Sequence, residues 1–212
     1  MIYFKKIIFY AFVLNILLLG SLFAQINNSI ILKVGNSIVT SLQLKNEINT
    51  ILILTKREIN QKNINDVKNF ATKSIIRNII KKNEIEKLEV KDYNKEELNK
   101  IISNISKSLK TNKSGLKLIF KKNGVSYDAL VDKYKTDLLW NTLIFKKFKN
   151  QININIIEID NDIKKIINKD DKKKIDIEKL RKKIINQKKN EKLELFSRSH
   201  YSNLENNTLI SE

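Results

Sequence analysis

The stretch LKVGNSIVTS, residues 32–41, decides the fold, because the period of its apolar residues changes within it. Two β-branched runs, Ile30–Val34 and Ile38–Thr40, stand on either side of a Gly-Asn pair. Glycine at the first central position permits the positive φ of a type II′ turn, so the stretch predicts a β-hairpin. From Ser41 onward, apolar residues recur every three or four positions, the period of an amphipathic helix. A small hairpin is therefore expected to lead directly into a helical body.

Downstream of the hairpin, each predicted helix begins at a polar residue that can accept a hydrogen bond from a first-turn backbone N–H group. Glu97 stands three positions after one of these residues and completes a capping-box pattern. Gly124 is placed to end the short fourth helix. The predicted helix starts are Ser41, Asn65, Asn94, Ser114 and Ser126. Apolar residues with helical spacing follow each start, so the predicted fold class is mainly α, with several helices.

The region after the fifth helix is predicted to begin as an extended segment. Isoleucine alternates with asparagine from Ile152 to Ile156, and this period of two indicates extended backbone over residues 151–160. A short helix is then expected from Asp160 or Asn161 to Ile167. Residues 169–175 are charged and poor in apolar side chains, and we interpret them as a linker.

The C-terminal part, residues 176–212, is expected to return to the hairpin. It contains a predicted helix from Asp176 to Leu204 and a predicted short strand, Thr208–Ile210. A short terminal strand is not stable alone, and neither is an isolated two-stranded hairpin. We therefore predict that the strand adds to the hairpin and joins the two ends of the chain.

The first 24 residues have the layout of a secretory signal peptide. Lys5 and Lys6 precede an apolar run that is shorter than the roughly 20 residues of a membrane span. Ala24 is a small residue suited to cleavage before Gln25. The alternative is an uncleaved signal anchor, since Leu22 is larger than the residue usual at that position. In either case the body of the protein is expected outside the cytoplasm, in the periplasm.

Composition limits the chemistry of the chain. It has 212 residues, 42% of them hydrophobic, which is enough for a core. It has no cysteine, so thiol catalysis, disulfides and cysteine metal sites are excluded. An exported protein held together by packing alone suits a periplasm-like compartment.

The charge of the chain has two possible origins. The formal net charge is +18, and it would be +16 without the two lysines of the predicted signal. Such a charge is typical of proteins that bind nucleic acid or anionic membranes. However, the excess is almost entirely lysine, isoleucine and asparagine are abundant, and proline is absent. A genome rich in A+T would favour the same residues, so both interpretations stay open.

The order of these elements resembles that of the N-terminal domain of SurA-type periplasmic chaperones. The resemblance is carried by residues 32–41, by the capped segment NKEEL at 94–98, and by the junction FKKNGVSY at 120–127. The tail from Leu180 through Tyr201 to Ile210 is similar to the closing helix and strand of that family. The resemblance implies a helical chaperone domain over residues 25–168, on which residues 176–212 pack back.

The chain differs from the family in one respect that bears on activity. Family members usually carry parvulin-type prolyl isomerase domains between the long helix and the closing helix. Only residues 160–176 occupy that place here, and they contain no glycine. The resemblance therefore implies the chaperone module alone, which holds unfolded outer-membrane proteins or other exported polypeptides without isomerase activity. Transient contact with the membrane or with an outer-membrane insertion machinery is a further expectation.

A chaperone of this type needs exposed apolar surface, and aromatic side chains offer large contact area. Ordinary core packing is the alternative for each candidate, and it is preferred for Tyr134, Phe145 and Phe148. Trp140 lies off the apolar stripe of its helix and is predicted to be exposed. The candidate client-contacting residues are Phe120, Tyr127, Tyr134, Trp140, Phe145 and Phe148.

Catalytic chemistry is not expected. His200 is the only histidine and lies in a polar stretch, where we interpret it as a surface residue. The glycines of the mature chain are too far apart to form a phosphate-binding loop. Asp170 and Asp171 are flanked by lysines in the predicted linker and are interpreted as a solvated charge run. No enzyme activity, cofactor or metal is therefore predicted.

Two other functions remain open. In the first, the uncleaved N-terminal segment anchors a basic helical domain that has a structural or scaffolding role in the cell envelope. In the second, the chain is an exported nucleic-acid binder, although it contains no dedicated recognition motif.

Overall fold

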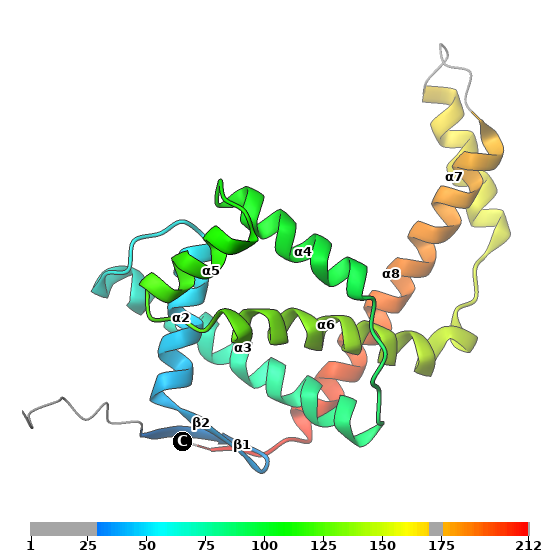
Figure 1. Cartoon of the computed structure of the whole chain (residues 1–212). Helices are drawn as coiled ribbons and strands as arrows, with labels where there is room; N and C mark the ends of the chain where they lie inside the picture. The colour runs from blue at the N-terminus through cyan, green and yellow to red at the C-terminus, as the bar shows by residue number, and fades with distance from the viewer. Residues whose placement is uncertain (1–28, 170–175, 212) are drawn as a thin grey trace, which may run out of the picture.

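The computed structural model describes residues 29–169 and 176–211. This described part of the chain is 75% helical and contains seven helices and one three-stranded antiparallel sheet, which confirms a mainly α fold (Figure 1). The predicted signal peptide, with its cleavage site between Ala24 and Gln25, lies outside the described residues. So does the predicted linker, except for Lys169, which ends a helix.

The sheet joins the two ends of the described chain, as predicted. Strands β1 (Ile30–Val34) and β2 (Ser37–Thr40) form the hairpin, and β3 (Ile210–Ser211) pairs with β1, so that the strand order is β2-β1-β3. Gly35 has a φ of +57°, which fits the first central position of a type II′ turn. Its backbone N–H donates to the carbonyl of Leu209 over 2.8 Å. The closing strand begins two residues later than the sequence predicted.

The first helix begins at Ser41, as predicted, and the second begins earlier than expected. Helix α2 (Ser41–Leu54) is capped by Thr40, which forms a capping box with Gln43. Helix α3 (Gln61–Lys87) begins after Asn60, so the predicted start at Asn65 is wrong. The side chain of Asn60 accepts a hydrogen bond from the backbone of the third helical residue over 2.9 Å. The preference of asparagine for helix starts does not distinguish these two positions.

The next three helices follow the predicted pattern closely. Asn94 caps α4 (Lys95–Ser108) and Ser126 caps α6 (Tyr127–Phe148), as predicted. Helix α5 (Lys113–Lys122) is capped by Asn112 instead of Ser114. Gly124 follows α5 with a φ of +63°, a conformation that glycine adopts without strain.

The expected extended segment is shorter than predicted. After a 3-10 turn, η1 (Lys149–Gln151), the backbone lies outside any helix or strand only to Asn155, and α7 (Ile156–Lys169) begins five residues before position 161. The side chain of Asn155 accepts a hydrogen bond from the backbone of Ile157 over 3.0 Å and caps the helix. The last helix, α8 (Ile177–Asn206), is capped by Asp176, as predicted.

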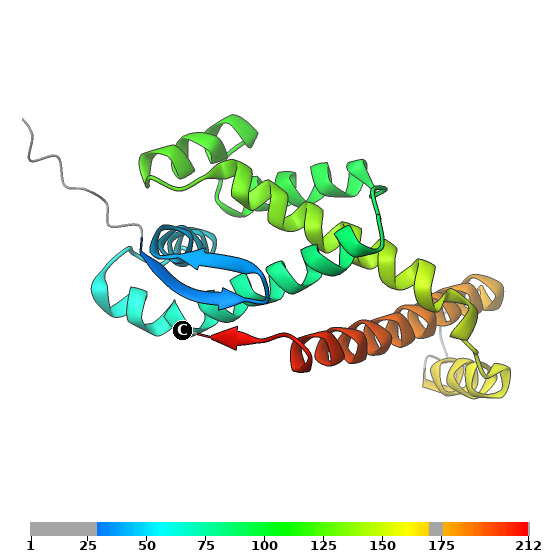
Figure 2. The same cartoon turned by 90° about the horizontal axis from the view of Figure 1, so that it is seen from below.

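Helix α3 lies at the centre of the main body. Helices α2, α6 and α8 pack against it, and the sheet covers its middle through a cluster that joins Val34, Val39 and Ile80. The pair α4–α5 packs on α6, on the side away from the sheet (Figures 1 and 2). Helix α7 and the first half of α8 form a helical arm that projects from this body (Figure 1).

Candidate functional site

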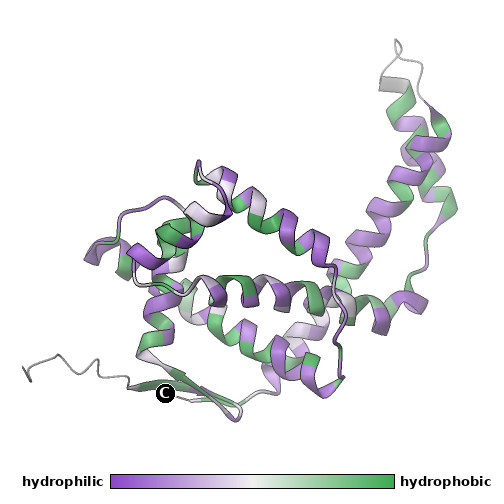
Figure 3. Ribbon diagram, in the orientation of Figure 1, coloured by the Kyte–Doolittle hydropathy of each residue, from purple (hydrophilic) through white to green (hydrophobic). Residues whose placement is uncertain are grey.

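The outer face of the hairpin exposes apolar side chains. Ile38 and Thr40 share one face of β2, because side chains alternate along a strand, and Ile30 lies opposite Thr40 in the register. Ile30 and Ile38 therefore belong to the same face, and they are 65% and 50% exposed. The opposite face is buried on α3 through Leu32, Val34 and Val39. We call Ile30 and Ile38 the outer sheet face; Figure 3 shows how much of the hairpin is hydrophobic.

Strand β2 also leaves one edge without a neighbour. In the order β2-β1-β3 it pairs only with β1, and among residues 29–169 and 176–211 no other strand lies beside it. Such an edge can accept an extended polypeptide through its backbone groups, except for the N–H of Thr40, which already donates to Gln43 Oε1 in the capping box. The outer sheet face therefore adjoins the free edge of β2.

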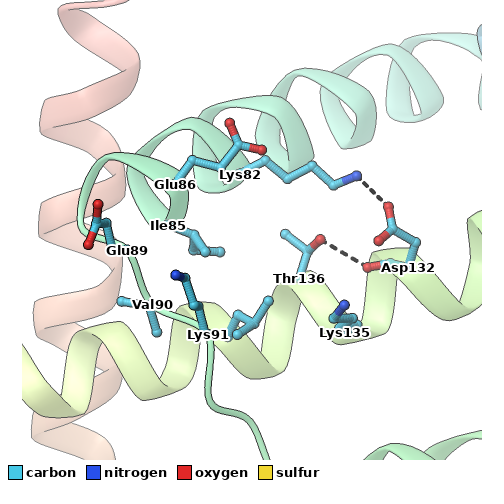
Figure 4. Close-up of a pocket in the computed structure, with 10 residues that line it drawn as sticks. Lys82, Ile85, Glu86, Glu89, Val90, Lys91, Asp132, Lys135 and Thr136 are labelled. Atoms are coloured by element: carbon cyan, nitrogen blue, oxygen red, sulfur yellow. Dashed lines mark hydrogen bonds and ion pairs between the residues drawn. The ribbon is translucent and has the colours of Figure 1, made fainter.

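A cleft runs between α3 and α6. Its largest hollow has a volume of about 550 Å³ and is closed at one end by the segment that follows α3 (Figure 4). A second hollow of about 290 Å³ lies nearer to α2 and shares Lys82 and Asp132 with the first. A third, of about 270 Å³, shares Ser74 and Lys133 with the second. Each of these neighbouring hollows shares lining residues with the next, and we refer to the three together as the groove.

Ion pairs cross this groove and fasten its walls. Lys81 of α3 lies 2.6 Å from Asp137 of α6, and Lys82 pairs with Asp132 (Figure 4). Nearer to α2, Lys133 pairs with Glu47. Burial, followed by the nearby carboxylates Asp137 and Glu47, raises the pKa of Tyr134. The lining of the groove therefore combines paired charged side chains with apolar ones.

The helical arm has an apolar core of its own. Ile159 and Ile163 of α7 pack on Ile184 of α8, and this cluster shares no buried residue with the clusters of the main body. Arg181 and Lys188 of α8 pair with acidic residues of α7 and stabilise the hairpin of helices. Four other isoleucines of the arm are exposed: Ile156, Ile157, Ile166 and Ile177.

The six predicted aromatic candidates differ widely in their exposure to solvent. Trp140 is 1% exposed, so the prediction that it is exposed is wrong, and Phe120 is completely buried. Tyr127 and Tyr134 are half-buried against the cluster around Phe120. Only one candidate presents a large surface: Phe145, for which core packing had been preferred, is 51% exposed.

Phe148 is half-buried at the junction of α6 and α8. Its ring stacks on that of Phe196, with centroids 4.9 Å apart. The sequence missed the exposed aromatic Phe70, which is 61% exposed at one end of the groove. Phe70 belongs to the apolar face of α3, and that face is wider than the surface that α3 buries. This excess width was the sequence feature from which the exposure of Phe70 could have been predicted.

Trp140 and His200 meet inside the body. Their rings stack with centroids 5.6 Å apart, and the indole N–H of Trp140 donates to Ser197 Oγ over 2.8 Å. Trp140 faces α8 because that helix covers the side of α6 that lies off its apolar stripe. The spacing of apolar residues within α6 could not show that α8 also packs against this helix.

His200 is not the surface residue that the sequence predicted. Its side chain is 10% exposed, and its Nε2 lies 3.0 Å from Glu84 Oε1 and 3.3 Å from Lys147 Nζ. Burial, and then the positive charge of Lys147, lower the pKa of His200, while Glu84 opposes this shift. His200 of α8 therefore contacts side chains of both α3 and α6. Its imidazole does so mainly in the neutral form.

The remaining findings limit what the surface can do. In the described residues, no group of three or more histidine, aspartate and glutamate side chains is arranged to hold a metal ion. Every helix of this part of the chain is either too short or too polar to cross a bilayer. No protein-family model matches the chain, and comparison with curated proteins finds no relative. The fold and surface define a mainly α protein with a free sheet edge and exposed apolar side chains.

Proposed function

We propose that the chain is a periplasmic holdase chaperone. It binds unfolded outer-membrane proteins, or other exported polypeptides, and keeps them from aggregating on their way to insertion. It does this without ATP and without prolyl isomerase activity. The observation that carries the proposal is the pairing of β3 with β1, because this closure by the C-terminal tail is the arrangement that the resemblance to SurA-type chaperones implies.

The outer sheet face and the edge of β2 are the proposed client site. An unfolded β-barrel protein offers extended segments with alternating apolar side chains. Such a segment can add to the free edge of β2 through its backbone, while its apolar side chains contact Ile30 and Ile38. Contacts of this kind depend little on client sequence, as a general holdase requires.

The test is suppression of aggregation. The protein beginning at Gln25 contains every described residue, and we expect it to keep an unfolded outer-membrane β-barrel protein soluble after dilution from denaturant. No suppression at several-fold molar excess would contradict the holdase proposal.

Matched variants test the client site separately. The double substitution Ile30→Asn and Ile38→Asn removes the apolar contacts of the outer sheet face from positions that are already exposed. We expect it to weaken suppression several-fold while the melting temperature changes little. The control is Leu195→Asn, which removes a side chain that is 64% exposed on α8. Equal suppression by both variants would exclude the outer sheet face as the client site and leave the holdase function itself intact.

A further inference from the structure

Beyond the first turn of α4, which contains Glu96 and Glu97, the helical pair α4–α5 carries positive charge and no acidic residue. Between Leu98 and Tyr127 the sequence has seven lysines and no aspartate, glutamate or arginine. All seven side chains are exposed, and every ion pair of the described residues lies outside this stretch. We call this surface the lysine lobe; its members are Lys100, Lys107, Lys110, Lys113, Lys117, Lys121 and Lys122.

Codon bias does not explain this distribution. A bias toward lysine raises the number of lysines along the whole chain, but it does not remove acidic residues from one part of it. With 23 acidic residues among 212, a stretch of this length would carry about three. On the neighbouring helices, lysines such as Lys81 and Lys133 do pair with carboxylates. The lysine lobe is therefore a segregated charge on one part of the surface.

An exposed leucine lies among these lysines. Leu118 of α5 is 57% exposed, while Leu116 and Phe120 of the same helix are completely buried. Lys121 and Lys122 follow Leu118 at three and four positions, so they share its outward face. The outer face of α5 thus combines an apolar side chain with flanking positive charges.

We propose that the lysine lobe docks the protein on an anionic phospholipid membrane. Lysines attract the negative headgroups, and their aliphatic stems allow the ammonium groups to stay at headgroup level while Leu118 enters the acyl boundary. A nucleic acid fits this surface less well. Arginine, which binds phosphate bidentately, is absent from residues 98–127, and the two aromatic rings of the stretch, Phe120 and Tyr127, are buried or half-buried.

The position of the lysine lobe leaves the rest of the surface accessible. In both views, α4–α5 and the sheet lie on opposite sides of the central helices (Figures 1 and 2). A protein held at a membrane through α4–α5 therefore keeps its sheet directed away from the bilayer. The inference goes beyond the proposed chaperone function and does not depend on it.

Vesicle sedimentation tests the proposal with the protein beginning at Gln25. We expect it to sediment with phosphatidylcholine vesicles that contain about one-third phosphatidylglycerol and not with vesicles of phosphatidylcholine alone. Binding should fall steeply as salt rises from about 50 to 300 mM, because the Debye length shortens. Equal sedimentation with both kinds of vesicle would overturn the proposal.

Two sets of substitutions remove the same charge from different places. The lobe variant changes Lys107, Lys113, Lys121 and Lys122 to glutamine. The control variant changes Lys45, Lys62, Lys68 and Lys73, which are exposed on α2 and α3, to glutamine. We expect the lobe variant to bind anionic vesicles at least about tenfold more weakly, and the control to stay near the unmodified protein. Equal weakening of vesicle binding in both variants would show that only the net charge of the protein matters. This result would overturn the proposal.

Leu118 distinguishes a membrane from a nucleic acid. Leu118→Asn keeps every charge and changes an exposed side chain, so it should weaken vesicle binding several-fold without affecting the circular dichroism spectrum. Binding to a DNA duplex of arbitrary sequence is measured in parallel. Tighter binding to the duplex than to the vesicles, with no effect of Leu118→Asn on either, would assign the lysine lobe to nucleic acid and overturn the membrane proposal.

Discussion

Val34 in β1 lies opposite Ile210 in β3, although the two residues stand near opposite ends of the chain. Val34 is completely buried, whereas Ile210 is 40% exposed at the outer end of the pairing. Strand β3 therefore occupies the edge of β1 that β2 leaves open. Through the turn at Asn207 and Thr208, it connects α8 to the body.

Deletion of Thr208–Glu212 is expected to destabilise the protein by about 1–3 kcal/mol, because it removes the hydrogen bonds of β3 and uncovers part of Val34. Thermal unfolding followed by circular dichroism measures the change. The control is Leu209→Ala, which keeps the backbone of the strand and alters a side chain that is 76% exposed. An unchanged melting temperature after the deletion would show that the pairing contributes nothing to stability.

Local sequence predicted most of the elements because their signals are local. The turn at Gly35, the caps at Asn94, Ser126 and Asp176, and the helical period after each cap depend on a few neighbouring residues. The closing strand was predicted from a long-range argument that an unpaired strand and an isolated hairpin need each other.

The sequence predictions were wrong where contact with another helix, distant in the sequence, determines the local structure or the burial of a side chain. The spacing of Ile152, Ile154 and Ile156 is that of a strand, yet Ile156 begins α7, since the packing of Ile159 and Ile163 on α8 favours a helix. Judged from their own helices alone, Trp140 and His200 were predicted to lie at the surface. Each is buried because a third helix covers it, and only the tertiary structure reveals which faces meet.

Ser197→Ala should destabilise the protein by about 1–2 kcal/mol, because the buried indole N–H of Trp140 loses the hydroxyl that accepts its hydrogen bond. Chemical denaturation followed by tryptophan fluorescence measures this directly, since Trp140 is the only tryptophan. Ser199→Ala, at an exposed position on the same helix, is the control and should change stability little. A loss no larger than that of the control would contradict the importance of this hydrogen bond.

Stability should fall in mildly acidic solution because of His200. Its pKa in the folded protein lies below the ordinary value of 6.5, so the unfolded chain binds a proton more readily. The free energy of unfolding should therefore decrease as the pH falls from about 6.5 toward the lowered pKa, and level off below it. Denaturation at several pH values measures this dependence, against His200→Gln as the reference.

The lone histidine also makes the pKa directly observable. A single imidazole signal in the NMR spectrum should titrate with a midpoint below 6.5 in the folded protein. Lys147→Met removes the positive charge that disfavours the imidazolium, so it should move this midpoint upward. A midpoint at or above 6.5 in the unmodified protein would contradict the electrostatic account of this site.

The helical arm should be able to unfold without the rest of the protein, because its cluster shares no buried residue with the main body. Ile159→Ala removes a completely buried side chain from this cluster and should cost the arm about 2–4 kcal/mol. Hydrogen exchange should then accelerate in α7 and the first half of α8, while the fluorescence transition of Trp140 stays nearly unchanged. Ile157→Ala is the control, because Ile157 is 72% exposed on the same helix. A parallel loss of protection in α3 and α6 would instead show that the arm and the body unfold as one cooperative unit.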